Sequence, residues 1–462
     1  ISGCADPGIT AAFLVFGRRS GWPSTGILWT SSFNGVDGVK IIPDRSTATS
    51  TFGYEKPQCI PDYNQDGIDD VLISDPNYKN LHGRAYLIHG RSSWPSQLDL
   101  SLSFDGVIFS SSLSSTSKKE ITIGSALGSL DLNLDDHIDL VIGAAEADSG
   151  HGQVHVVWGH GESSPLPSAM YLPVNSTSQG CYFTGPSKAS KLGSSITTGD
   201  INGDGHDDLM VASKGLYTVT VVFASKTIAW ALNMTLVPNA ISFIDGIGFG
   251  EEFGYSLSTG DINGDEFDDV FIGASQALSY TGRVYIWFGS ATPSSIALTS
   301  TSEPDGTTWS RINGNADGGL LGISVGTVHG IPGTADDLIT AAAAANNEMG
   351  MGYLLSRSTC KTSINSKCLM CIAGYGLDST ASTCSPCTDH TYSIGSTPCR
   401  KTQTLSSCLD YSETGPCIQC SPGTGLKYGE CFTCAGNTWS NGTVSCILIT
   451  AVTGLSLIHI SQ

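Results

Sequence analysis

Charged residues are scarce in this sequence, and positively charged residues are the scarcest. Asp, Glu, Lys and Arg make up 14% of the chain, with 22 Lys and Arg against 42 Asp and Glu. The few basic residues form no stripe, which argues against a nucleic-acid-binding protein. Helical periodicity is almost absent, so we expect no helical fold. The chain is instead rich in Gly, with 55 among 462 residues, and carries a net charge of −20.

One nine-residue loop occurs four times. Asp occupies positions 1, 5 and 9 and Asn occupies position 3, so a tight turn can bring their oxygens to one point. The backbone carbonyl of position 7 would add another oxygen. Calcium takes about six to eight such ligands, and four loops in one repeat register predict about four calcium ions. The expected ligands are Asp62, Asn64, Asp66, Ile68, Asp70, Asp131, Asn133, Asp135, His137, Asp139, Asp200, Asn202, Asp204, His206, Asp208, Asp261, Asn263, Asp265, Phe267 and Asp269.

The residues that follow each loop exclude an EF-hand. An EF-hand needs a bidentate Glu at loop position 12, between two helices. That position is apolar in all four copies, and it lies in a short run rich in β-branched residues. Such runs are typical of buried strands, so the loops connect strand to strand. The four residues are Ile73, Ile142, Val211 and Ile272.

Other features recur with the loops at a period of roughly 60–70 residues. An aromatic or aliphatic residue followed by Gly precedes each loop, and a strand ending in small residues follows it. A second strand closed by Gly comes next, and a polar-alternating strand leads into the following repeat. Four short strands per unit predict an all-β protein built as a β-propeller. The marker before the loops occurs as Phe52-Gly53, Ile123-Gly124, Leu192-Gly193, Phe253-Gly254 and Leu321-Gly322.

These markers together resemble the FG-GAP repeats of integrin α subunits, over about residues 1–357. The resemblance implies a propeller of integrin α type, whose calcium loops lie on one face and stiffen the ring. It also implies that a ligand binds the opposite face. Five full repeats and part of another are visible, whereas the family usually closes a ring of seven. We therefore expect further blades N-terminal to this sequence.

Some repeats depart from the family pattern at the loops. The fifth repeat keeps only Asp337 of the expected ligands, so we expect no metal there. Loop position 6, where the turn needs a positive φ, is Gly in two loops but Asp136 and Glu266 in the other two. A residue other than Gly costs about 1 kcal/mol in that conformation, which predicts weaker binding by these two loops.

Twelve of the 15 cysteines lie within residues 358–447. They form two six-cysteine modules, 358–403 and 404–447, followed by a tail at 448–462. Modules this small cannot build an adequate apolar core and need covalent cross-links, so we expect about three disulfides in each. A zinc ribbon is the alternative, although six cysteines exceed one tetrahedral site. The modules loosely resemble furin-like and growth-factor-receptor cysteine-rich repeats. The copies are Cys360, Cys368, Cys371, Cys384, Cys387 and Cys399, then Cys408, Cys417, Cys420, Cys431, Cys434 and Cys446.

Glycosylation sequons begin at Asn175, Asn233 and Asn441. Together with the cysteine modules they indicate an extracellular or cell-surface glycoprotein. The sequence starts with neither Met nor a signal peptide. We interpret residues 455–461 as translated sequencing-adapter sequence. The alternative is the start of a membrane anchor, although the segment is too short to span a bilayer.

The sequence offers few candidate catalytic residues. Residues 322–326 match the Gly-x-Ser-x-Gly nucleophile elbow, which needs a strand, a turn and a helix. Ser324 instead occupies the repeat position of Ser256, so we interpret it as a strand residue. His151 and His155 lie on or beside a strand, and we interpret them as surface histidines. We expect no catalytic site and no cofactor other than calcium.

The leading hypothesis is an extracellular, calcium-stabilised adhesion or recognition protein. Its propeller would present a protein or glycan ligand with the face opposite the calcium loops, on a disulfide-rich stalk with or without a membrane anchor. Cysteine modules stand where integrins carry immunoglobulin-like domains, so no partner subunit is implied. Two alternatives stay open. FG-GAP propellers also accompany catalytic domains, as in glycosylphosphatidylinositol-specific phospholipase D, and a surface-coat component would need no discrete ligand.

Overall fold

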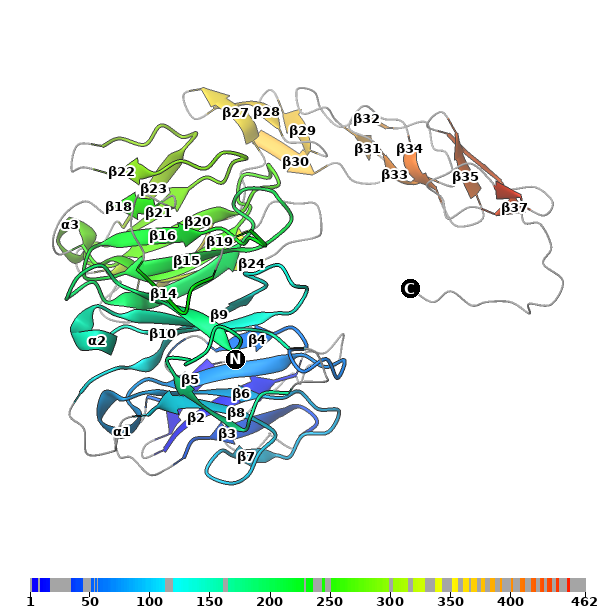
Figure 1. Ribbon diagram of the computed structural model, residues 1–462. Helices are drawn as coiled ribbons and strands as arrows, with labels where there is room; N and C mark the ends of the chain where they lie inside the picture. Colours follow the sequence, from blue (N-terminus) through cyan, green and yellow to red (C-terminus); the bar gives the residue numbers. More distant parts are fainter. Residues whose placement is uncertain are drawn as a thin grey trace, which may run out of the picture. The chain divides into compact units, whose positions relative to one another are not determined.

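The computed structural model of the chain divides into two compact units, Ile1–Ser356 and Arg357–Gln462 (Figure 1). In the second unit the structure describes only the backbone of its strands. In the first unit it describes residues 2–6, 9–16, 35–44, 51–53, 55, 57–112, 119–160, 165–227, 230–235, 243–245, 251–298, 302–314, 319–328, 337–342 and 351–355.

Six β-sheets make up the described part of the first unit, which confirms the predicted all-β fold of propeller type. Neighbouring strands are antiparallel within each repeat. In hydrogen-bonded order the first three sheets are β1 (Ser2–Asp6), β2 (Ile9–Val15), β3 (Gly38–Ile42) and β7 (Gln97–Asp99); β4 (Gln58–Ile60), β5 (Asp70–Asp75), β6 (Arg84–Ile88), β8 (Gly106–Ser111) and β12 (Ala169–Leu172); β9 (Ile123–Leu130), β10 (Asp139–Ala144), β11 (Gln153–Val157), β13 (Gly180–Thr184) and β17 (Asn233–Thr235).

The remaining three sheets of this unit follow the same order. They are β14 (Leu192–Gly199), β15 (Asp208–Ser213), β16 (Thr218–Val222), β18 (Phe243–Asp245) and β22 (Ile296–Ala297); β19 (Phe253–Gly260), β20 (Asp269–Ala274), β21 (Arg283–Trp287) and β23 (Trp309–Asn313); β24 (Leu321–Val328), β25 (Asp337–Ala342) and β26 (Met351–Leu355).

The second strand of a repeat is its most buried element. All six residues of β5, β10, β15 and β20 are buried, as expected for the apolar runs that follow the loops. Clusters of apolar side chains form between neighbouring sheets, for example where Leu72 of β5 and Ile142 of β10 belong to one cluster. The sheets therefore stabilise one another by burying apolar area, and no sheet has a closed core of its own.

Four of the sheets gain an extra strand that the sequence analysis did not predict. The strands β7, β12, β17 and β22 come from the following repeat and pair in parallel with β3, β8, β13 and β18. These added strands are only two to four residues long. Four repeats thus extend the outer edge of the sheet before them, in addition to packing against its face.

The aromatic-or-aliphatic-Gly marker forms the junction between sheets. Isolated parallel bridges join Gly83 to Ile123, Gly152 to Leu192 and Gly282 to Leu321. At the second junction Gly152 has a φ of 73°, and a Cβ there would overlap the backbone nitrogen of Leu192. The Gly that precedes the third strand is therefore needed both for its backbone conformation and for the close approach of the next sheet.

The three short helices are turns of the first unit. They are α1 (Tyr78–Leu81), α2 (Ala147–Gly150) and α3 (Ala277–Tyr280), each between the second and third strands of a repeat. Their centres have left-handed residues, such as Asp148 and Ser149 in α2 and Leu278 in α3. They are thus tight connections rather than true α-helices, in agreement with the missing helical periodicity. No helix in the described part of the chain is long and apolar enough to cross a membrane.

The described strands of the second unit form six two-stranded hairpins. Three hairpins lie in the first segment predicted as a cysteine module and three in the second, where the last strand ends one residue beyond it, at Leu448. The cysteine side chains are outside the described residues, so the expected disulfides stay a prediction. The hairpins are β27 (Cys360–Ile364) with β28 (Lys367–Cys371), β29 (Tyr375–Asp378) with β30 (Thr383–Pro386), β31 (Thr391–Tyr392) with β32 (Arg400–Lys401), β33 (Cys408–Tyr411) with β34 (Cys417–Cys420), β35 (Thr424–Lys427) with β36 (Glu430–Thr433), and β37 (Thr438–Trp439) with β38 (Ile447–Leu448).

Candidate metal-binding loops and the cavity at the opposite strand ends

Each of the four loops ends in a buried carboxylate that begins a strand. Asp139 starts β10 and is fully buried. Its Oδ2 accepts the backbone N–H of Leu132, 2.9 Å away, and its Oδ1 accepts that of Gly159, 2.8 Å away. Position 9 therefore closes its own loop and also ties the loop to the end of the third strand. Asp70, Asp208 and Asp269 are equally buried and bond to Gly90, Ala224 and Gly289.

The polar side chains at positions 1, 3 and 5 are held by the peptide groups of their own loop. In the second loop the N–H of Asp136 donates to Asp131, and the N–H of Asp135 donates to Asn133. The N–H of His137 donates to Asp135 over 3.0 Å. The third loop repeats all three bonds. The donors in these hydrogen bonds are backbone N–H groups, so all four loops can orient their carboxylates in this way whatever their other residues.

Two residues of each loop have a positive φ. Position 6 is left-handed in all four copies, at 86° for Gly67 and Gly205, 68° for Asp136 and 72° for Glu266, which confirms the predicted conformation. Position 4 is left-handed as well, and the sequence analysis missed it. The Gly in two of the four copies at that position was the available signal. The position 4 residues are Gln65, Leu134, Gly203 and Gly264.

Several predicted ligand oxygens are buried without a hydrogen-bond donor. They are Oδ1 of Asp62, Oδ2 of Asp208 and Oδ1 of Asn263, one in each of three loops. A buried oxygen without a donor is costly, and a cation would satisfy it. The donor set of carboxylates, one amide oxygen and one carbonyl contains oxygen alone, which suits calcium and excludes soft metals. The residues present therefore fit a hard divalent cation.

The carboxylates are not gathered into a dense acidic cluster. Within the described residues no group of three or more His, Cys, Asp or Glu side chains is close enough to hold a metal ion by itself. The proposed sites draw part of their oxygens from Asn and from the peptide chain, so Asp side chains alone would not complete them.

Burial makes the position 9 carboxylates hard to ionise while no cation is bound. Burial raises the pKa of Asp139 and of Asp269 to about 8, against the hydrogen bonds that each accepts. For Asp208 burial raises the pKa to about 7. The negative charges at positions 1 and 5 add to the rise in all three cases. A bound divalent cation would lower the pKa of these carboxyls, because its positive charge favours the ionised form.

Neighbouring loops touch one another at equivalent positions. Nε2 of Gln65, at position 4 of the first loop, lies 2.9 Å from Nδ1 of His137, at position 7 of the second. In the third and fourth loops the same two positions are Gly203 and Phe267, and a Cβ on Gly203 would overlap the Phe267 ring. The first strand of each repeat, such as β9, β14 or β19, is called its inner strand here. The loops therefore support one another at the end of these inner strands. In the fifth repeat Asp337 starts β25, and the loop before it lies outside the described residues.

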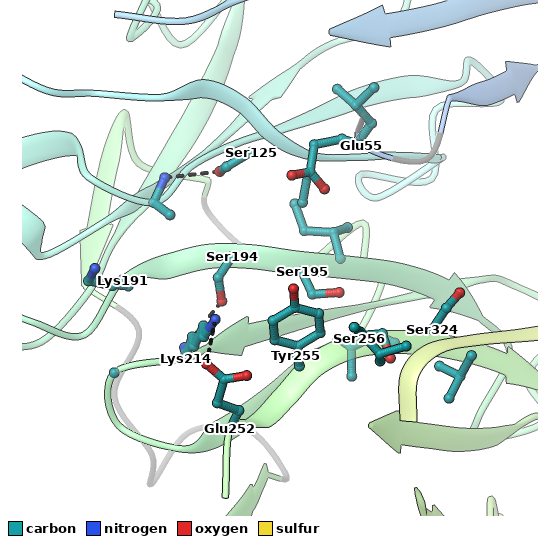
Figure 2. Close-up of a pocket in the computed structure, with 18 of the residues that line it drawn as sticks. Glu55, Ser125, Lys191, Ser194, Ser195, Lys214, Glu252, Tyr255, Ser256 and Ser324 are labelled. Atoms are coloured by element: carbon teal, nitrogen blue, oxygen red, sulfur yellow. Dashed lines mark hydrogen bonds and ion pairs between the residues drawn. The ribbon is translucent and has the colours of Figure 1, made fainter. Parts of the chain in front are cut away.

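A cavity of about 760 Å³ lies at the other end of the inner strands (Figure 2). Ala126, Ser195 and Ser256 line it, each as the fourth of the eight residues of β9, β14 and β19. Lys191 and Glu252, which precede β14 and β19, line it too, whereas the loops follow the last residues of those strands. This size suits a small ligand or the side chains of a larger one. Ala126 lies four residues before the last residue of β9, roughly 13 Å along the strand, so the cavity and the loops are separate.

Most charges of the cavity wall are paired. Lys191 Nζ lies 2.7 Å from Glu146, and Lys214 Nζ lies 3.2 Å from Glu252. Lys214 also sits over the Tyr255 ring, 4.3 Å from its centre. Hydroxyl, amide and aliphatic groups share the remaining wall, so the cavity is of mixed polarity and close to neutral. These residues were missed in the sequence analysis, because no motif marks them.

The carboxyl of Glu55 also lines the cavity and belongs to neither of these two ion pairs. Burial raises the pKa of Glu55 to about 7, while the positive charge of Lys214 lowers it. Glu55 therefore carries less than its full negative charge near neutral pH. Lys191 and Glu252 stand just before the Leu-Gly and Phe-Gly markers, with φ of 52° at each. This left-handed residue before the marker aims both side chains into the cavity.

The candidate catalytic residues have structural explanations. Ser324 is exposed and lies inside β24, which continues to Val328, so residues 322–326 do not form the strand–turn–helix of a nucleophile elbow. The interpretation of His155 as a surface residue was wrong, since this residue of β11 is only 1% exposed and burial lowers its pKa to about 3. Its ring packs in the sheet beside Tyr182. His151 is half-buried, with Nδ1 2.7 Å from the carbonyl of Asp148.

Comparison with known proteins identifies the repeats. The FG-GAP repeat family matches residues 192–222 and 253–287. Mouse phosphatidylinositol-glycan-specific phospholipase D is 30% identical over 160 residues, which is 33% of this chain and 17% of the enzyme. Drosophila melanogaster integrin alpha-PS2 is 38% identical over 109 residues, 21% of this chain and 7% of the integrin. This chain therefore carries FG-GAP repeats in a β-propeller fold, similar in part to integrin alpha and to that phospholipase.

Proposed function

We propose that this chain is part of an extracellular recognition protein whose propeller is stabilised by calcium in four loops. The observation that carries the proposal is the fourfold repetition of one loop geometry, with a buried Asp that joins the loop to the end of a strand. Calcium at these loops would neutralise the Asp side chains that recur at positions 1, 5 and 9 of each loop. The metal would then act as a structural element, with the carboxylates, Asn amides and position 7 carbonyls as its ligands.

The ligand would bind at the strand ends opposite the loops. Support comes from the cavity there, which joins residues from neighbouring sheets and offers paired charges, hydroxyls and Tyr255. Such walls of mixed polarity suit a ligand with both polar and apolar groups, either a glycan or the side chains of a protein. The propeller would itself be non-catalytic, since Ser324 is a residue inside strand β24. The second unit would serve as a disulfide-rich stalk.

A binding test can use substitutions that fill the cavity. Ser195→Trp would occupy the space between β14 and β19, whereas Ser294→Trp would place the same ring at an exposed position outside the cavity. The full chain would be tested for attachment to intact cells and to cells stripped of surface glycans or of surface proteins. Loss of attachment with Ser195→Trp alone supports the cavity as the ligand site. Equal attachment by both variants contradicts it.

The similarity to phosphatidylinositol-glycan-specific phospholipase D supports a second candidate function. In that case the propeller would accompany a catalytic domain encoded on the same polypeptide. The chain spans less than a fifth of that enzyme's length, so the shared region leaves most of the enzyme unmatched. Sequencing of the complete transcript distinguishes the two functions. A catalytic domain with a His and Asp metal cluster would favour the enzyme, and a signal peptide followed directly by repeats would favour the recognition protein.

A further inference from the structure

Two glycosylation sequons of the first unit lie at the outer edges of adjacent sheets. Asn233 begins β17, the last strand in the order of its sheet. Asn175 follows three residues after β12, which ends the neighbouring sheet in the same way. Both Asn residues are exposed, as are Thr177 and Thr235, which complete the two sequons. The structure thus leaves both acceptor sites open to an enzyme.

The alternation of β17 turns the sequon at Asn233 outward. Met234 is partly buried and packs against an apolar cluster between the sheets, while Asn233 and Thr235 are exposed on either side of it. Successive side chains of a strand point to opposite faces, so both sequon residues share the solvent face. The pairing of Met234 with Phe183 of β13 fixes this register.

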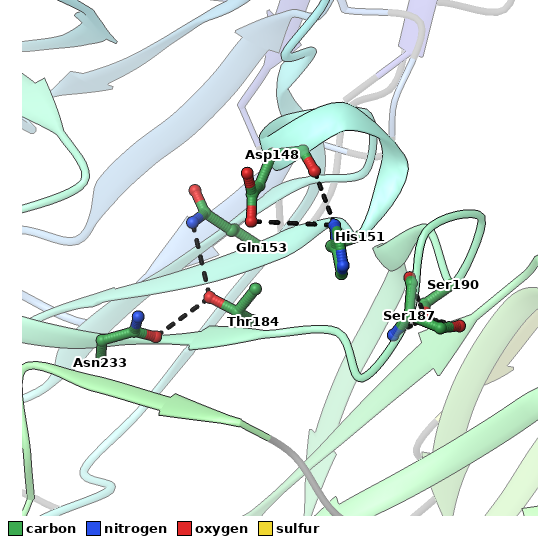
Figure 3. Close-up of polar contacts among 7 residues, drawn as sticks. All are labelled: Asp148, His151, Gln153, Thr184, Ser187, Ser190 and Asn233. Carbon is green, nitrogen blue, oxygen red and sulfur yellow. Dashed lines mark hydrogen bonds and ion pairs between the residues drawn. The ribbon is translucent and has the colours of Figure 1, made fainter.

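The side-chain amide of Asn233 is oriented by a neighbour. Its Oδ1 accepts a hydrogen bond of 3.0 Å from the hydroxyl of Thr184, and Gln153 lies on the other side of Thr184 (Figure 3). Among the hydrogen bonds of the described residues none involves Nδ2 of Asn233. The oxygen is therefore engaged and the nitrogen, which is the atom that receives a glycan, is presented to solvent.

The other sequon begins four residues after an exposed aromatic residue. Tyr171 of β12 is 66% exposed on a strand whose outer edge has no partner among the described strands. Trp158 fixes the turn after Asn175, because its indole N–H donates to the carbonyl of Thr177 over 2.9 Å. An open edge with an exposed aromatic side chain is a site where another chain can add a strand.

We propose that Asn175 and Asn233 carry N-linked glycans that cover these two sheet edges. Nδ2 of each Asn attacks the anomeric carbon of an oligosaccharide linked to a lipid diphosphate. A C–N bond forms, the bond from that carbon to the diphosphate oxygen breaks, Nδ2 loses one proton, and the lipid diphosphate leaves. The Thr184 hydrogen bond persists, since Oδ1 is not used. A hydrated glycan at each edge would exclude strand addition by a second chain.

The test compares two substitutions at one hydroxyl. The full chain would be secreted from eukaryotic cells, with a reporter glycoprotein as a control for the glycosylation machinery. Thr235→Ala abolishes the sequon yet keeps Asn233 and its bond to Thr184, whereas Thr235→Ser keeps the sequon. Peptide mapping before and after treatment with peptide N-glycosidase should show loss of one glycan in Thr235→Ala alone. An unmodified Asn233 in the parent chain, beside a glycosylated reporter, would overturn the proposal.

The role of the glycans is measured separately by light scattering after size exclusion. Thr177→Ala and Thr235→Ala combined should raise the fraction of associated chains, while the matched Ser variants should behave as the parent. Removal of the glycans from the parent under native conditions should give the same rise. Glycans that are present, but whose removal leaves the fraction of associated chains unchanged, would overturn the edge-covering role.

Discussion

The carboxylate of Asp139 accepts a hydrogen bond of 2.8 Å from the backbone N–H of Gly159. The bond joins the start of β10 to the residues just after β11. The same relationship recurs between Asp70 and Gly90 over 2.7 Å, and between Asp269 and Gly289 over 3.0 Å. The last Asp of each loop thus belongs to the sheet and to the candidate metal site at once, so we expect metal binding and sheet stability to be coupled.

This double role predicts different results for two ligands of one loop. Asp135→Ala should remove one calcium ion and change the free energy of unfolding little in chelator, because Asp135 is exposed. Asp139→Ala should remove the same ion and also cost about 1–3 kcal/mol in chelator, since two buried N–H groups lose their acceptor. Calcium titration and urea unfolding of both variants measure this. Equal stability of the two in chelator would contradict the assignment.

The left-handed residue at position 6 predicts opposite effects in different loops. Gly67→Ala and Gly205→Ala should each destabilise the propeller by about 1 kcal/mol, because a Cβ meets no atom within 4 Å there and only the positive φ is unfavourable. Glu266→Gly should stabilise the fourth loop. Asp136→Asn tests the charge alone, since Asn tolerates the conformation. Thermal melts in calcium rank the variants by melting temperature. An unchanged melting temperature for Gly205→Ala would contradict the prediction.

The junctions between sheets predict a larger effect at Gly152. Gly152→Ala should cost several kcal/mol, because its Cβ would overlap the backbone of Leu192 and force two sheets apart. Gly326→Ala is the matched control in β24, where nothing lies within 4 Å of a Cβ. Urea unfolding of the full chain gives both values. Similar free energies of unfolding for these two variants would contradict the prediction, because they would show that the two sheets can move apart at Gly152 without loss of stability.

Buried His155 predicts a pH-dependent loss of stability. Its pKa is about 3 in the folded chain and about 6.5 when unfolded, so between these values only the unfolded chain binds the proton. The free energy of unfolding therefore falls as pH decreases through this window, by up to about 1.4 kcal/mol per pH unit. His155→Tyr, which introduces the residue that the equivalent position has in Tyr86 and Tyr285, should remove this slope. The difference between the two unfolding curves isolates the histidine, and parallel curves would contradict the prediction.

The repeat, the strands and the loop conformation followed from the sequence because each depends on local residue pattern. The conformation at Asp136 and Glu266 was predicted from the Gly at the same place in sister loops. The added strands were missed, since β17 has three residues and forms only against the preceding sheet. The cavity was missed for a related reason: Lys214 and Glu55 come together from separate repeats, and no spacing along the chain indicates that proximity.

The central claim is that the four loops bind calcium as part of the fold. Calorimetric calcium titration of the full chain, with thermal melts in calcium and in chelator, tests it most directly. We expect saturable binding of about four ions and a large rise in melting temperature, because ligand that binds only the folded state stabilises it. Absence of binding together with identical melts would contradict the account, and the recognition function built on it would fall with it.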